Sequence, residues 1–84
     1  MLPPPQDFFY NHPNRTLSWE DITGAVEYQI EYQDPQGIIN PPIYCTVNHC
    51  PFDHSAGEYN VHGKTKDDGG WGIPGPWRKI IVGS

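Results

Sequence analysis

Cys45 and Cys50 are the two residues whose type and spacing could do covalent chemistry. Four residues separate them, so a disulfide here would close a small loop and contribute about 2 kcal/mol on a chain-entropy model. A disulfide would also indicate an oxidising compartment. Two free buried thiols are one alternative, and a zinc site with ligands from His49, His54 and His62 is another. We predict the disulfide and keep both alternatives open.

The acidic residues offer little for catalysis. Asp67 and Asp68 are adjacent in the sequence, so their side chains point apart instead of converging on one substrate. Paired-carboxylate chemistry needs two acids that face each other across a cleft. The sequence also has no nucleophile elbow, no His-Glu-x-x-His motif and no phosphate-binding glycine loop. We therefore expect no enzyme activity, no cofactor and no resident metal.

Aromatic side chains are better candidates for a functional role. Trp71 lies in the glycine- and proline-rich segment Asp67–Pro76, which we expect to be the longest and most mobile loop. An exposed tryptophan on a loop often marks a contact site; the alternative is that Trp71 folds back over a sheet edge. Tyr44 is the second predicted binding residue. Asn14-Arg15-Thr16 is an N-glycosylation sequon, which has a meaning only in a secreted chain.

Short runs of alternating large and polar residues must position these side chains. Successive side chains of a strand point to opposite faces, so each run offers one apolar face to a shared core. We expect strands over residues 8–10, 15–22, 26–33, 58–66 and 77–82, short strands within 38–47 and another from residue 50. The predicted core consists of Leu17, Trp19, Tyr28, Ile30, Tyr32, Tyr59, Val61, Trp77, Ile80 and Val82.

Composition and charge narrow the class of protein. The chain has 84 residues, enough for one domain, and its β-branched and aromatic residues favour strands. We expect a Pro-rich linker or disordered lead over residues 1–7, a single domain over 8–82 and a tail over 83–84. A net charge of −5 with only five basic residues argues against nucleic-acid binding. No apolar stretch approaches the roughly 20 residues of a membrane-spanning helix.

Taken in order, these residues resemble the fibronectin type III family. Leu17-Ser-Trp19 is similar to the family's strand B, and Gly24-Ala-Val-Glu-Tyr28-Gln-Ile30-Glu-Tyr32 is similar to its strand C. Phe52 with Gly57-Glu-Tyr59-Asn-Val61, and Gly75-Pro76-Trp77 with the Ile80 and Val82 alternation, complete a resemblance over about residues 17–82. It implies an all-β, seven-strand immunoglobulin-like sandwich. In that sandwich Trp19 fills the core, and the Tyr59 hydroxyl bonds back to upstream backbone.

The family resemblance implies an interaction module. We expect a non-catalytic structural and protein-binding domain of a larger multidomain protein, extracellular or on the cell surface, which spaces its neighbours and is a monomer when isolated. Its partner would be another protein or neighbouring domains of the same chain. The alternative is a carbohydrate-binding accessory module whose Trp71, Trp77 or Tyr44 stack on sugar rings, which exposed coplanar rings would favour. A cytokine-receptor-like ligand-binding domain ranks below both, because the double Trp-Ser motif is absent.

Overall fold

The structure, a computed structural model, describes residues 1–83, which form eight strands and no helix. In chain order the strands are β1 (Phe9–Asn11), β2 (Thr16–Ser18), β3 (Glu27–Gln33), β4 (Ile43–Cys45), β5 (His49–Pro51), β6 (Gly57–Asp67), β7 (Gly70–Trp71) and β8 (Arg78–Val82). Within this described part, nothing has the helical length and apolar character needed to cross a membrane. The chain is all-β, as its alternating runs predict.

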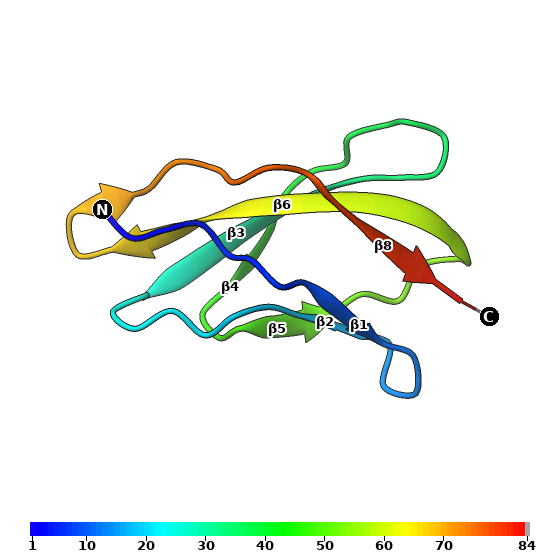
Figure 1. The fold of residues 1–84 in the computed structure, drawn as a ribbon, viewed down its shortest axis with the longest axis horizontal. Helices are drawn as coiled ribbons and strands as arrows, with labels where there is room; N and C mark the ends of the chain where they lie inside the picture. The colour runs from blue at the N-terminus through cyan, green and yellow to red at the C-terminus, as the bar shows by residue number, and fades with distance from the viewer. Residues whose placement is uncertain (84) are drawn as a thin grey trace.

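The strands form two antiparallel sheets (Figure 1). The three-stranded sheet has the order β1-β2-β5. The five-stranded sheet has the order β4-β3-β6-β7, and β8 also pairs with β6. β3 and β6 are in register from Glu27 opposite Lys66 to Gln33 opposite Asn60, while β7 and β8 share the other edge of β6. The prediction of seven strands is therefore wrong by one, because β7 and β8 divide a single sheet edge between them.

The apolar faces of the two sheets enclose one core. Trp19 is 4% exposed, and its ring packs edge-on against Tyr28 and at a tilt against Phe8. At the end of the core the Tyr59 hydroxyl donates to the Ser55 carbonyl oxygen at 2.8 Å. Four residues of the buried apolar core are not in the predicted core list: Tyr10, Ile22, Cys50 and Phe52. The other buried apolar residues are Leu17, Trp19, Tyr28, Ile30, Tyr59, Val61, Ile80 and Val82.

Of the residues predicted for the core, Trp77 lies outside it and Tyr32 lies at its margin. Trp77 is 40% exposed and precedes β8. Since Ile80 and Val82 face the core, strand alternation assigns Trp77 to the opposite face of the strand, with Lys79. Tyr32 is half-buried at the margin of the core. The alternation that identified the core therefore also places Trp77 on the outer face of the five-stranded sheet.

The Asp67–Pro76 segment is not the free loop that we predicted. β6 runs on to Asp67 and turns through Asp68 and Gly69 into β7. The Asp67 Oδ1 accepts the Gly69 N–H at 2.8 Å, which closes this turn. Further along, the Gly72 N–H donates to the Thr65 carbonyl and the Gly75 N–H to the Gly63 carbonyl. The segment is thus attached to β6 along most of its length.

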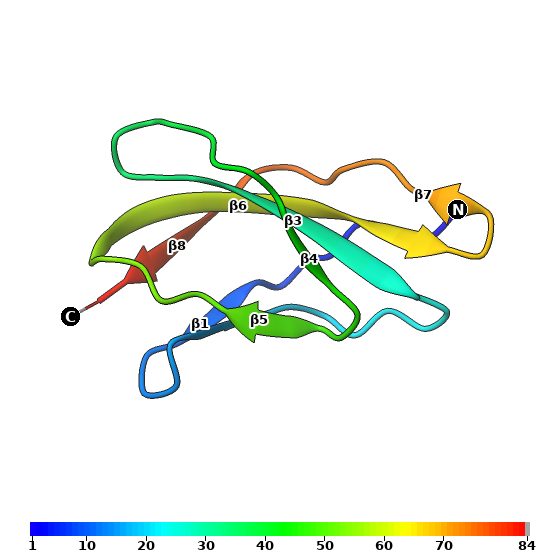
Figure 2. The same ribbon diagram turned by 180° about the vertical axis from the view of Figure 1, so that it is seen from behind.

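Residues 1–7, which we expected to be a linker or disordered lead, lie beside this attached segment. Pro5 is buried and Leu2 packs against the core. A Cβ built on Gly72 would come within 2.7 Å of the Leu2 carbonyl oxygen, so the two backbones are in close contact there. Figures 1 and 2 show the N-terminus next to β7. The lead therefore covers the side of the core that the broken β7–β8 edge leaves open.

Gly63 is a tight point of contact between the two longest strands. It belongs to the buried row of β6, opposite Ile30 of β3. A Cβ built on Gly63 would lie 2.4 Å from the Gln29 carbonyl oxygen and 2.7 Å from the Ile30 Cδ1. No side chain fits this space without moving β3 away from β6.

We expect Gly63→Ala to lower the free energy of unfolding by about 1–3 kcal/mol, the usual cost of overpacking a core. Urea denaturation of the wild type and the variant measures this loss. The matched control is Lys64→Ala on the outer face of the same strand, which should change stability by only about 0.5 kcal/mol. A Gly63→Ala protein as stable as the wild type would contradict this packing of β3 on β6.

Candidate functional site

Tyr44 and Trp71 meet on the outer face of the five-stranded sheet. Tyr44 lies in β4 opposite Gln29 of β3, and Trp71 lies in β7 opposite Lys66 of β6. Their ring centroids are 6.1 Å apart. The Gln29 Nε2 donates to the Tyr44 hydroxyl at 2.9 Å, which fixes the direction of that ring. Two residues that were predicted separately are thus brought together by four adjacent strands.

Two lysines complete this surface, and the sequence reasoning missed both. The Nζ atoms of Lys64 and Lys66 each lie 5.6 Å from the centroid of the Trp71 ring, within the range of cation–π attraction. The Lys66 Nζ is also 4.0 Å from the Glu27 Oε1. Lys64 forms no ion pair among the described residues. We call Gln29, Tyr44, Lys64, Lys66 and Trp71 the Trp71 face.

The sequence did contain the signal for this arrangement. Tyr59 and Val61 point inward from β6, so alternation sends Lys64 and Lys66 outward. Asp68-Gly69 between two extended runs is a recognised hairpin signal, and the hairpin places Trp71 opposite Lys66. Trp71 is consequently half-buried. It is a strand residue with lysines over its ring, neither a free loop residue nor a lid on the core.

Trp77 extends the aromatic surface further along β6. Its ring stacks on the His62 imidazole, with centroids 3.7 Å apart and planes inclined by 19°. The His62 Nε2 is 2.8 Å from the Glu31 Oε1, and its Nδ1 is 3.1 Å from the Gly75 carbonyl oxygen. Glu31, His62 and Trp77 therefore fasten the segment before β8 onto the outer face of the sheet.

The aromatic rings do not form a flat platform for a sugar. The Tyr44 and Trp71 planes are inclined by 59°, whereas stacking on one sugar chain calls for coplanar rings. One face of Trp77 is occupied by His62. A hollow of about 460 Å³ adjoins Trp71, and Met1, Gly24 and residues 67–71 line it. Its Asp67 carboxylate already bonds the Gly69 N–H and lies 3.6 Å from the Met1 amine.

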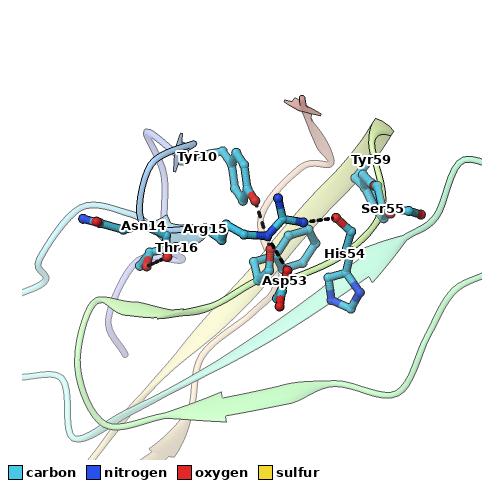
Figure 3. Close-up of polar contacts among 9 residues, drawn as sticks. Tyr10, Asn14, Arg15, Thr16, Asp53, His54, Ser55 and Tyr59 are labelled. Atoms are coloured by element: carbon cyan, nitrogen blue, oxygen red, sulfur yellow. Dashed lines mark hydrogen bonds and ion pairs between the residues drawn. The ribbon is translucent and has the colours of Figure 1, made fainter. Parts of the chain in front are cut away.

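Arg15 organises the opposite end of the domain (Figure 3). Its φ is +51°, in the left-handed region, and its guanidinium pairs with the Asp53 carboxylate. The Arg15 Nη2 also donates to the His54 carbonyl oxygen at 2.6 Å. The hydrogen bond to Asp53 raises the pKa of Arg15 above its ordinary value. These bonds tie the β1–β2 turn to the connection between β5 and β6.

The polar groups of the Arg15 cluster are already paired with groups of the same chain. The Tyr10 hydroxyl donates to the Phe52 carbonyl at 3.2 Å, and the Tyr59 hydroxyl donates to the Ser55 carbonyl. The Phe52 ring packs against His54 and Tyr59, with centroid distances of 4.4 and 5.4 Å. We conclude that this cluster holds the end of the domain together.

The predicted Cys45–Cys50 disulfide is absent from the structure, where both cysteines are free thiols. Cys45 ends β4 in one sheet and Cys50 lies in β5 of the other, so the two thiols come from different sheets. Burial raises the pKa of the Cys50 thiol to about 12, and the neighbouring Cys45 adds to this shift. Cys50 therefore acts as a small apolar core residue.

The zinc alternative has no geometry to support it. Within residues 1–83, no three side chains of the metal-binding types gather in one place. Comparison of the chain with protein-family models, with curated proteins and with solved structures gave no match in any of the three.

The buried Cys50 thiol should make the protein less stable in alkali. Between its ordinary pKa of 9.0 and its folded pKa of about 12, the unfolded chain has lost the thiol proton and the folded chain keeps it. Stability therefore falls as pH rises through this window. Burial also raises the pKa of Tyr32, which acts in the same direction. Urea denaturation across the window should give a shallower decline for Cys50→Ala than for the wild type.

A thiol count on denatured, unreduced protein is the control for that comparison. Two free thiols are expected. A count of zero would show that the bridge forms after all, and the Cys50 contribution to the alkaline decline would then disappear.

Proposed function

We propose that this chain is a non-catalytic interaction module of the fibronectin type III kind and that it binds a protein partner through the Trp71 face. The strand orders β1-β2-β5 and β4-β3-β6-β8 support the family assignment, with β7 as an added hairpin strand. The Tyr59 hydroxyl bond to Ser55 supports it as well. The module would belong to a larger extracellular or cell-surface protein.

The observation that carries the binding proposal is the meeting of Tyr44 and Trp71 on a sheet surface. Tyrosine and tryptophan are the side chains that most often dominate the energy of protein–protein contacts. Both rings stand on strands, and Gln29 orients one of them. The side chains of this surface would consequently lose little conformational entropy when a partner binds. More of the contact energy would then appear as affinity.

The charges of the Trp71 face indicate the chemistry of the partner. The chain as a whole carries a net charge of −5, yet the Trp71 ring lies under two ammonium groups. Lys64 has no carboxylate partner among residues 1–83, in contrast to Lys66. A protein surface with a carboxylate beside an apolar group would pair with Lys64 and cover the rings. Such complementarity sets orientation and association rate more than affinity.

The shape of the domain agrees with a spacer role. Its longest dimension is 39 Å. Figure 1 shows the first residues near one end of that long axis and the end of β8 near the other. Neighbouring domains joined at these points would be held apart by the length of the sandwich. The Trp71 face would remain accessible on its flank.

Binding should depend on the rings of the Trp71 face. Wild-type domain and variants are immobilised, and proteins captured from an extract of the source cells are identified by quantitative mass spectrometry. Dissociation constants are then measured with the purified partner. We expect Trp71→Ala and Tyr44→Ala to weaken binding by about tenfold or more, as central aromatic contacts do.

Ile81→Ala is the matched control, because Ile81 is exposed on β8 and lies outside the Trp71 face. It should bind as the wild type does. Urea denaturation must also show that Trp71→Ala stays within about 1 kcal/mol of the wild type. Unchanged affinity in a Tyr44→Ala, Trp71→Ala double variant would exclude this face as the binding surface.

A further inference from the structure

The sequon Asn14-Arg15-Thr16 occupies the turn between β1 and β2. It is the one place in the 84-residue sequence where asparagine is followed, two residues later, by serine or threonine. Asn11 pairs with Thr16 across the hairpin, so Asn14 lies in the turn that joins the two strands. Asn14 is exposed. The position is therefore open to a large attached group.

The backbone of this turn is fixed by its own hydrogen bonds. The Asn14 N–H donates to the Asn11 Oδ1 at 3.1 Å, and the Thr16 Oγ1 donates to the Asn14 carbonyl oxygen at 3.1 Å. The Arg15 side chain extends the other way, to Asp53 and the His54 carbonyl. Figure 3 shows the Asn14 side chain pointing away from that cluster. A group attached to the Asn14 side chain would disturb none of these hydrogen bonds.

Asn14 differs from the other four asparagines in the use of its side chain. The Nδ2 atoms of Asn40, Asn48 and Asn60 donate to neighbouring groups, and the Asn11 Oδ1 accepts the Asn14 N–H. Among residues 1–83, the Asn14 side chain makes no hydrogen bond. Its amide can therefore be modified without breaking any bond of the fold.

We propose that Asn14 is an N-glycosylation site, a modification that rests on the extracellular location in the proposed function. The co-reactant is an oligosaccharide linked to a lipid pyrophosphate. The Asn14 Nδ2 forms a bond to the anomeric carbon of the sugar and loses one proton. The bond from that carbon to the pyrophosphate oxygen breaks, and the lipid pyrophosphate leaves with the electron pair. No oxidant or reductant is needed.

The glycan would leave the binding surface open. The β1–β2 turn lies near one end of the long axis, whereas β7 with Trp71 lies near the other, in both views (Figures 1 and 2). The two features also belong to different sheets. A glycan on Asn14 would shield the Arg15 end of the domain and restrict partners to the Trp71 face.

The test is to secrete the full chain, behind a cleavable leader, from cultured eukaryotic cells and to weigh the intact product. We expect a single mass increase that peptide N-glycosidase removes, leaving an aspartate at position 14. Asn14→Gln and Thr16→Ala should abolish the increase, and Thr16→Ser should retain it. A secreted wild-type chain without the increase would overturn the proposal.

Two further measurements test the Asn14 glycosylation site independently of the proposed binding face. The glycosylated and enzymatically deglycosylated chains should share one circular dichroism spectrum and one thermal midpoint; a glycosylated chain that is misfolded would also overturn the proposal. Asn14→Gln should bind the partner as the wild type does. Glycosylation without partner binding would therefore reject the proposed binding face alone, and partner binding without glycosylation would reject the Asn14 site alone.

Discussion

The pairing of β6 along both of its edges is the constraint on which the rest of the structure depends. β3 pairs with one edge from Asn60 to Lys66, and β7 and β8 pair with the other. A slip of one residue would turn Val61 and Thr65 out to solvent and bring Lys64 into the core. The register that buries the core is thus the same register that builds the Trp71 face.

Glycine and proline residues between β7 and β8 determine how the chain pairs with the second edge of β6. Gly72 and Gly75 donate their N–H groups to the Thr65 and Gly63 carbonyls of β6. Pro74 and Pro76 have no N–H group, so this stretch cannot complete a regular ladder. The edge is therefore occupied but discontinuous, and its discontinuity explains why the structure has β7 and β8 where one strand was expected.

Strand alternation made the core predictable, and the same rule shows why part of the candidate site was missed. It identifies Tyr28, Ile30 and Val61 as inward-facing, and the structure buries all three. Applied strictly to β8, the same rule turns Trp77 outward, so the prediction that Trp77 belongs to the core did not follow the alternation of Ile80 and Val82.

Contacts between residues that are distant in the sequence could not be predicted from strand alternation. Leu2 packs on the core because the discontinuous edge leaves room there, and no local pattern encodes that space. The two cysteines come from different sheets, so their separation in sequence says little about the geometry that a disulfide requires. Tyr44 and Trp71 are 27 positions apart in the sequence. They meet through the pairing of β4, β3, β6 and β7, which only the complete sheet order defines.

The Arg15 end and the Trp71 face differ in how many of their polar side chains are already bonded within the chain. At the Arg15 end, the guanidinium and the Tyr10 and Tyr59 hydroxyls all bond to carboxylate or carbonyl oxygens of the same chain. A partner there would have to replace bonds that already exist. On the Trp71 face, Lys64 lies over the Trp71 ring and forms no ion pair among residues 1–83, and Tyr44 is 55% exposed. A carboxylate brought to Lys64 would add an ion pair without removing one, which supports the proposal that a partner binds on this face.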